Sequence, residues 1–155
     1  MVGPATGPAA PQIVLAFDYG TRRIGVASGD TLTCTARALT TLERSAEPPW
    51  AAIDKLVQDF HPAQFVVGVP YNMDGTPTHL TAATRTFARE LHARYRNPVA
   101  LVDERLSSRE AEGQLREARA GGFKKRRLTH ADVDMAAAKV LLERWFQDPT
   151  AVEKI

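Results

Sequence analysis

The sequence predicts one α/β domain built on a mixed, five-stranded sheet that is flanked by helices. Three extended segments come first and follow one another through short turns, between residues 13 and 42. Helical and extended segments then alternate, and strands that are joined through helices run parallel. We therefore expect a three-strand antiparallel meander and two parallel strands in one sheet, with helices covering its faces.

The first extended segment has the most informative pattern. Ile13 to Phe17 are five consecutive apolar residues, which is typical of a strand covered on both faces at the centre of its sheet. Asp18 follows directly, and the chain turns at Gly20 before a second apolar run. A carboxylate at the end of a buried strand costs free energy unless a cation or donors meet it. Asp18 is therefore a candidate functional residue, with a simple turn-forming role as the alternative.

The next elements alternate between extended segments and segments with apolar residues at helical spacing. A third extended segment covers residues 32–42, and apolar residues at helical spacing follow from Trp50 until Pro62 ends the run. Residues 65–69 form a second uninterrupted apolar strand, which ends at Pro70. These patterns predict a helix that leads from the meander to a strand parallel to the first one.

A longer amphipathic helix begins near Leu80 and ends before Pro98, and residues 99–102 form a third apolar strand that ends in Asp103 and Glu104. The remaining chain predicts two helices. Their limits are given by capping and terminating residues, namely Ser107, Glu110, Gly121 and Gly122 for the first and Thr129 to about Gln147 for the second.

The last helix contains two aspartates that helical geometry separates. Each residue advances 100° around the axis, so Asp134 shares a stripe with Leu141 and Trp145, the face expected to pack inward. Asp132 falls on the polar side, where it is expected to point toward water and to complete a capping box opened by Thr129. Asp134 has neither a capping role nor a place on the polar face, so it is the candidate functional acid of this helix.

Parallel strands deliver their carboxyl ends to one edge of a sheet, so Asp18, an acid after the last apolar strand and Asp134 are expected to converge. Spacing does not separate Glu104 from Asp103 as the second acid. Converging carboxylates repel one another, and the usual compensation is Mg²⁺ or Mn²⁺, often as two ions. This combination is typical of phosphodiester hydrolysis.

Four segments, FDYGTRRIGVASGD, VVGVPYNMDGTPT, VDERLSSREAE and DVDMAAAKVLLERW, resemble in order and spacing the YqgF or RuvX family. Its members are described as Holliday junction resolvases and as pre-16S rRNA nucleases. The resemblance covers about residues 13–146. It implies a ribonuclease H-like fold, a cytoplasmic bacterial protein and a role at the 5′ end of precursor 16S rRNA. It also implies catalytic and metal-binding roles for Asp18, Glu104 and Asp134, and it selects Glu104 over Asp103.

Polar residues of the same motifs, and one basic run, are expected to contact the phosphate backbone of a nucleic acid. The alternative for each is an ordinary solvated surface position. These residues are Arg22, Arg23, Asn72, Arg105, Lys124, Lys125, Arg126 and Arg127.

Composition sets the remaining expectations. A net charge of +2 over 155 residues means that attraction to nucleic acid depends on where the cations cluster. We expect a leader at 1–11, the nuclease domain at 12–148 and a tail at 149–155, with no membrane span and a cytoplasmic location. The single Cys34 is expected to be a small core residue. Partners are precursor rRNA or branched DNA, and the ribosome or its precursors.

Two other functions fit parts of the sequence. A strand that ends in Asp-x-Gly-Thr also binds phosphate in sugar kinases and actin-type ATPases, but those proteins use two such domains to enclose a nucleotide. A nucleic-acid-binding module without catalysis is the second alternative, and the complete set of three acids argues against it. Backbone contacts serve RNA and DNA equally, so the sequence leaves that choice open.

Overall fold

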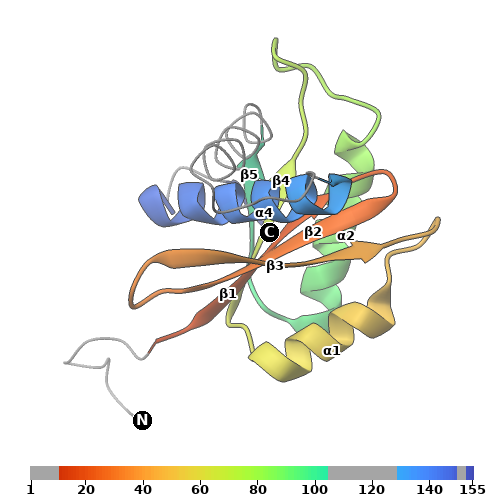
Figure 1. Cartoon of the computed structure of the whole chain (residues 1–155). Helices are drawn as coiled ribbons and strands as arrows, with labels where there is room; N and C mark the ends of the chain where they lie inside the picture. The colour runs from red at the N-terminus through yellow and green to blue at the C-terminus, as the bar shows by residue number, and fades with distance from the viewer. Residues whose placement is uncertain (1–10, 105–128, 150–152) are drawn as a thin grey trace.

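The computed structural model describes residues 11–104, 129–149 and 153–155. It confirms an α/β fold with a mixed sheet (Figure 1). The strand order is β3-β2-β1-β4-β5-β6, which places the first strand in the interior of the sheet, as its uninterrupted apolar run predicts. The strands are β1 (Ile13–Tyr19), β2 (Arg23–Asp30), β3 (Thr35–Glu43), β4 (Gln64–Val69), β5 (Val99–Asp103) and β6 (Glu153–Lys154).

The predicted directions are confirmed, whereas the predicted number of strands is wrong. The strands β1, β2 and β3 form the antiparallel meander, and β4 and β5 run parallel to β1. The sheet has six strands because Glu153 and Lys154 pair antiparallel with β5, beyond the predicted domain limit at 148. Two residues are too few to carry a strand periodicity, so the sequence pattern contains no sign of β6.

The third strand begins three residues later than the sequence predicts. The residues before it form the turn between β2 and β3, in which Cys34 has a φ of 54°. Cys34 is exposed, so the expectation that it packs in the core is wrong. A left-handed backbone at this position ends the extended run, which a pattern of residue types does not reveal.

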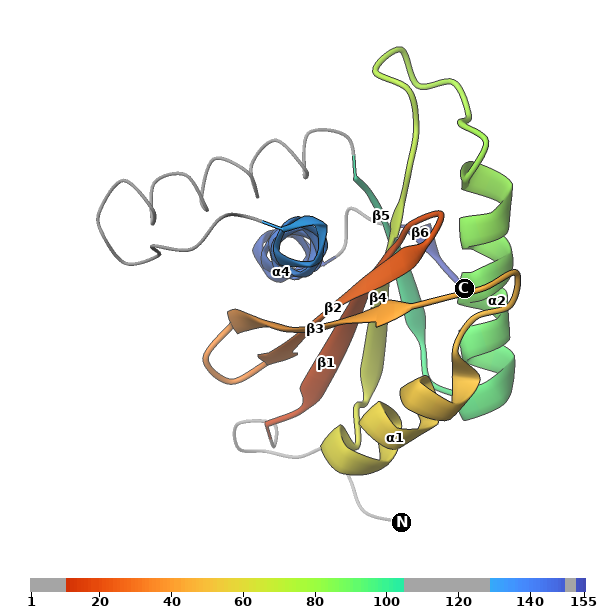
Figure 2. The same ribbon diagram turned by 45° about the vertical axis from the view of Figure 1, so that its right-hand side comes forward.

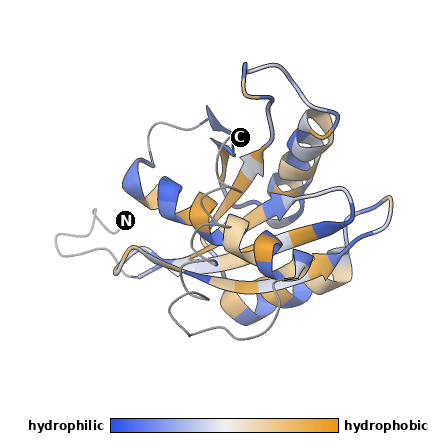
Figure 3. Ribbon diagram, turned by 45° about the horizontal axis from the view of Figure 1, so that its top comes forward, coloured by the Kyte–Doolittle hydropathy of each residue, from blue (hydrophilic) through white to orange (hydrophobic). Residues whose placement is uncertain are grey.

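Helices cover both faces of the sheet (Figure 2). The helices α1 (Trp50–Phe60) and α2 (Thr81–Tyr95) lie on one face, and α4 (His130–Gln147) lies on the other. Polar and apolar residues alternate around these helices (Figure 3). None of the helices in the described part of the chain has the length and apolar composition needed to cross a membrane. The helix predicted after Ser107 lies outside the described residues.

The face under α1 and α2 is built from large side chains. Phe87 of α2 is the centre of an aromatic cluster, with ring centroids 5.6 Å from Phe17, 4.7 Å from Tyr19 and 5.8 Å from Trp50. Burial of rings of this size is the largest apolar contribution that a single side chain makes to folding. This face therefore supplies much of the stability of the domain.

The face under α4 is built from small side chains. Its buried strand residues include Val14, Ala16 and Ala27, which pack against Leu141 of the helix. Gly25 of β2 lies even closer, because a Cβ atom there would stand 2.0 Å from the backbone oxygen of Asp134. The first turns of α4 therefore rest directly on the sheet backbone.

Candidate active site

The site is centred on a pair of carboxyl groups at the carboxyl edge of the parallel strands. Asp18 lies two residues beyond Ala16 in β1, so its side chain is on the face of the sheet that carries α4. Its neighbours in the adjoining strands are Gly25 and Gly68. Glu104 follows the end of β5 and forms a hydrogen bond with Asp18.

The two glycines beside Asp18 make room for the other acids, and the sequence analysis missed them. A Cβ atom at Gly68 would stand 2.8 Å from Oε2 of Glu104, and one at Gly25 would overlap the backbone of Asp134. Glycine inside a strand often marks the close approach of another group. Gly25 and Gly68 in otherwise apolar strands were therefore the available signal.

The electrostatics of the pair explain how two acids remain in contact. Burial raises the pKa of Asp18, and the charge of Asp134 raises it further, whereas the hydrogen bond with Glu104 acts in the opposite direction. Burial, the charge of Asp18 and their shared hydrogen bond raise the pKa of Glu104 to about 10. At neutral pH Glu104 therefore holds the shared proton and donates a hydrogen bond to Asp18.

Asp134 lies within electrostatic range of this pair, but its carboxylate is bound to an arginine. Nε of Arg23 donates to Oδ2 of Asp134 at 2.8 Å, and the two side chains are 33% and 26% exposed. Arg23 is the first residue of β2, and its carbonyl accepts a bond from the amide of Gly20 at 2.9 Å. The structure thus brings together Asp18, Glu104, Asp134 and Arg23.

The prediction for Asp132 is half right. The capping box is present, because the Asp132 amide donates to Oγ1 of Thr129 at 3.2 Å and its carboxylate accepts from the Thr129 amide at 3.0 Å. Asp132 is only 4% exposed, however, and does not point toward water. Its carboxylate folds back over the first turn, where Thr41 of β3 also bonds the carbonyl of Ala131. A helix that packs on one neighbour has a single covered stripe, whereas α4 contacts β1, β2 and β3 and is covered over a wider angle.

The residues predicted to contact nucleic acid differ in their surroundings, and some of them lie outside the described residues. Arg22 is exposed in the turn after Asp18. Nδ2 of Asn72 donates to Oγ1 of Thr76 at 2.9 Å and to the carbonyl of Pro77 at 3.3 Å, so this amide braces its own exposed loop. The remaining predicted contacts lie outside the described residues, namely Arg105, Lys124, Lys125, Arg126 and Arg127.

The donor set suits a hard divalent cation. Carboxylate oxygens are the ligands that Mg²⁺ and Mn²⁺ prefer, and a proton now compensates the repulsion between Asp18 and Glu104 that a cation would relieve. Within residues 11–104, 129–149 and 153–155, no three acidic, histidine or cysteine side chains are close enough together to hold an ion. In this arrangement the Asp134 carboxylate is paired with Arg23.

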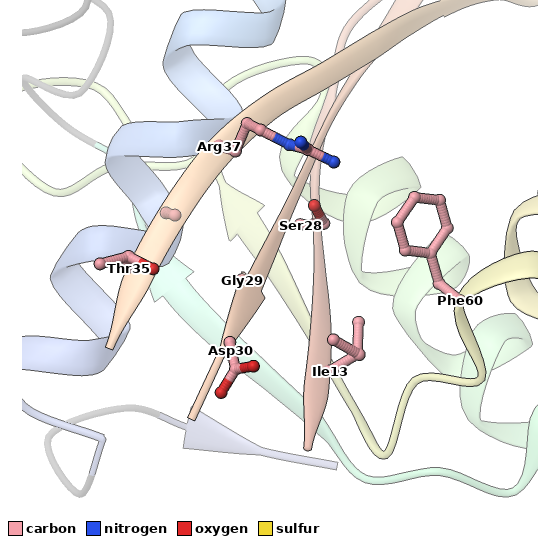
Figure 4. Close-up of a pocket in the computed structure, with 8 residues that line it drawn as sticks. Ile13, Ser28, Gly29, Asp30, Thr35, Arg37 and Phe60 are labelled. Atoms are coloured by element: carbon pink, nitrogen blue, oxygen red, sulfur yellow. The ribbon is translucent and has the colours of Figure 1, made fainter. Parts of the chain in front are cut away.

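A separate cavity of about 300 Å³ lies at the other end of the meander (Figure 4). Ile13, Arg37 and Phe60 are among its lining residues, and Ser28 contributes a hydroxyl group from β2. Among the described residues, its lining includes none of the predicted site residues. The chemistry-bearing residues therefore gather at the opposite end of β1 from this cavity.

The sequence model described as "RuvX: Holliday junction resolvase" matches residues 12–148. The chain belongs to the RuvX family. The predicted resemblance is thereby confirmed, and curated relatives agree with it. A candidate pre-16S rRNA nuclease of Yersinia enterocolitica is 45% identical over 140 residues, covering 90% of this chain and 97% of the relative. One of Cronobacter sakazakii is 48% identical over 135 residues, covering 86% and 95%.

Solved structures agree with the fold. The Thermus thermophilus RuvC in complex with a Holliday junction substrate superposes with a TM-score of 0.56 at 15% identity, covering 93% of this chain and 99% of that one. The yeast mitochondrial Holliday junction resolvase Ydc2 gives a TM-score of 0.53 at 12% identity, covering 86% and 77%. Identities this low make both comparisons statements about the fold of this RuvX family member, and the predicted mixed α/β sheet flanked by helices is confirmed.

Proposed function

We propose that this protein is a divalent-metal-dependent nuclease that hydrolyses phosphodiester bonds of precursor 16S rRNA, at its 5′ end. The observation that carries the proposal is the buried pair of Asp18 and Glu104, with Asp134 close enough to shift the pKa of Asp18. An acidic pair at the carboxyl edge of a mixed sheet is suited to binding a cation and a phosphate together. The names of the curated relatives support precursor rRNA as the substrate.

Asp18, Glu104 and Asp134 would hold Mg²⁺ or Mn²⁺. Such a cation would supply a water molecule of lowered pKa and would stabilise charge on the phosphate. Glu104, which shares a proton with Asp18, would release that proton in order to act as a ligand. Gly25 and Gly68 let α4 and Glu104 approach Asp18 closely, which keeps Asp18 buried and strengthens its electrostatic interactions.

Substrate binding in this proposal depends on backbone contacts near the same edge. Arg22 stands exposed beside the turn that follows Asp18, and the braced loop of Asn72 follows β4 at the same edge. Arg105 and the basic run from Lys124 to Arg127 adjoin the acids in sequence. We further propose that the protein acts in the cytoplasm and meets its substrate on ribosome precursors.

Branched DNA is the second candidate substrate. It is favoured by the Holliday junction resolvase description of the matching family and by the likeness of the fold to a RuvC that was solved with a junction. Both candidates would be cleaved by the same acids and cation, and they differ in the 2′-hydroxyl of the sugar and in how the strands are presented.

One experiment tests the proposal and ranks the substrates. A precursor 16S rRNA fragment and a four-way DNA junction are incubated with one preparation, with Mg²⁺, with Mn²⁺ and with chelator. We expect cation-dependent cleavage of the rRNA fragment that falls at least about a thousandfold in Asp18→Asn, Glu104→Gln and Asp134→Asn. The matched control is Asp59→Asn, an exposed acid of α1 paired with Lys55 at 3.8 Å, which should cleave normally.

Preferential cleavage of the junction would transfer the assignment to DNA. Full activity in any two of the three site variants would show that the acids are not the catalytic set.

A further inference from the structure

The ion pair between Arg23 and Asp134 differs from the other arginine pairs of the described residues. It joins one nitrogen to one oxygen, Nε to Oδ2, and no other hydrogen bond of the Arg23 guanidinium to the described part of the chain is present. A pair that uses two parallel bonds is stronger and more strictly oriented. The two-bond pairs are Arg85 with Glu153, at 2.9 Å for both bonds, and Arg94 with Asp54, at 3.1 Å for both bonds.

The difference has a direct chemical meaning. Arg85 and Arg94 fasten β6 and α1 to α2, and each binds both oxygens of one carboxylate through two of its nitrogens. Among the described residues, the two terminal nitrogens of Arg23 and Oδ1 of Asp134 have no bonded partner, so the first can meet a second anion and the other a cation. Phosphate is the anion that a planar guanidinium binds best through paired donors.

The backbones on both sides of this contact are fixed, so exchange requires only side-chain rotation. The carbonyl of Arg23 closes the turn through Gly20, and the carbonyl of Asp134 lies against Gly25 with no space for a Cβ atom. Thr41 also holds the first turn of α4 through a 2.9 Å bond to the carbonyl of Ala131. Both side chains are partly exposed, which leaves room for them to turn.

Asp134 already acts electrostatically on Asp18 while it is bound to Arg23. We propose that Arg23 is an exchangeable counter-ion: it neutralises Asp134 in the metal-free protein and moves to a substrate phosphate when Asp134 turns to the divalent cation. The proposal rests on the proposed nuclease function. It assigns Arg23 two anionic partners in succession, and it makes cation binding and phosphate binding favour each other.

The first test measures Mn²⁺ affinity by calorimetry without nucleic acid. Removing the competing guanidinium in Arg23→Gln should tighten Mn²⁺ binding by about five- to tenfold. In an Asp134→Asn background the same substitution should change the affinity by less than about twofold, because the competition acts through Asp134. The matched control is Arg37→Gln, which removes the same charge from β3 at the other end of the sheet and should change the affinity by less than about twofold.

The second test measures binding of a short single-stranded RNA with and without Ca²⁺. In the unmodified protein Ca²⁺ should strengthen RNA binding by about fivefold or more, and Arg23→Gln should lose that strengthening. Cleavage by Arg23→Gln should fall at least about tenfold even though its cation affinity rises. Arg23→Lys retains the positive charge but loses the planar pair of donors. Its Ca²⁺ effect and its cleavage rate should therefore lie between those of the unmodified protein and those of Arg23→Gln.

Several results would overturn the proposal. They are unchanged or weaker Mn²⁺ binding by Arg23→Gln, equal tightening in the Asp134→Asn background, or full retention of the Ca²⁺ effect on RNA. If the unmodified protein cleaves rRNA and any of these results appears, only the exchange is wrong. If the unmodified protein cleaves neither nucleic acid with any cation, the proposed function itself is wrong.

Discussion

The two faces of the sheet are built on opposite principles. Under α1 and α2 the strands present Phe17 and Phe65, which pack with Phe87 in a thick aromatic layer. Under α4 they present Ala16 and Gly25, and the helix backbone approaches the sheet backbone directly. Large buried side chains contribute stability, whereas small ones permit close approach.

Stability and chemistry are therefore assigned to different faces of one sheet. A thick layer on the α4 side would lift Asp134 away from Asp18 and Glu104. The thin layer costs apolar burial, and the aromatic layer on the other face offsets that cost. Changes on the two faces should therefore separate into effects on unfolding and effects on cleavage.

The largest effect on stability is expected from Phe87→Ala on the aromatic face. Removing a buried ring from contact with Phe17, Tyr19 and Trp50 should lower the free energy of unfolding by about 3–5 kcal/mol. Cleavage measured well below the melting temperature should stay near normal. Urea denaturation and cleavage rates are compared for the same sample. Loss of cleavage in a fully folded Phe87→Ala protein would break the division between the faces.

The second effect is a dependence of stability on pH, which we expect from Glu104 on the α4 face of the sheet. A carboxyl group whose pKa is raised by folding holds its proton more tightly in the folded state, so its contribution is complete below its unfolded value and is lost as pH rises. For Glu104 this window runs from about 4.5 to about 10. The metal-free protein should lose on the order of 5 kcal/mol between about pH 5 and about pH 9, at about 1.4 kcal/mol per pH unit. Urea denaturation across this range should show a flatter profile for Glu104→Gln, and an equally steep one would contradict the assignment.

Gly25→Ala adds a single methyl group between β2 and α4, on the face of the sheet that carries the acids. The added Cβ would stand 2.0 Å from a backbone oxygen of α4, so the helix must shift, at a cost of about 1–3 kcal/mol in unfolding free energy. Cleavage should fall strongly because Asp134 moves with the helix. Gly68→Ala is the comparison variant, since its closest contacts are side-chain ends of Leu141 and Glu104. It should lose less stability, and the reverse order in denaturation would show that α4 is not the rigid partner.

The smallest effect is expected from Asp132→Asn. The amide can still accept a bond from Thr129, so the loss should be at most about 1 kcal/mol through the weaker interaction with the helix N-terminus. Cleavage should stay nearly intact, in contrast to Asp134→Asn two residues further on. Melting temperature and cation-dependent cleavage are measured side by side. An inactive Asp132→Asn protein would show that the buried capping acid also has a role in the site.

The sequence predicted the meander, the parallel strands and the three helices of the described chain because apolar periodicity is set by burial. It also led to Asp18, Glu104 and Asp134, although the choice of Glu104 needed the family resemblance. It missed β6 because a two-residue strand has no period. The Arg23–Asp134 contact depends on how closely α4 sits on Gly25, and no local pattern records a distance between segments.

The contact between Arg23 and Asp134 joins residues 111 positions apart, whereas the first hairpin pairs Tyr19 with Ile24. Contacts that close long loops form later than local ones, since more chain entropy is lost in making them. During synthesis the meander can therefore form while Asp134 has yet to leave the ribosome. A nascent chain at that stage carries an incomplete set of acids, so the nuclease would stay inactive next to the RNA that encodes it until its last helix emerges.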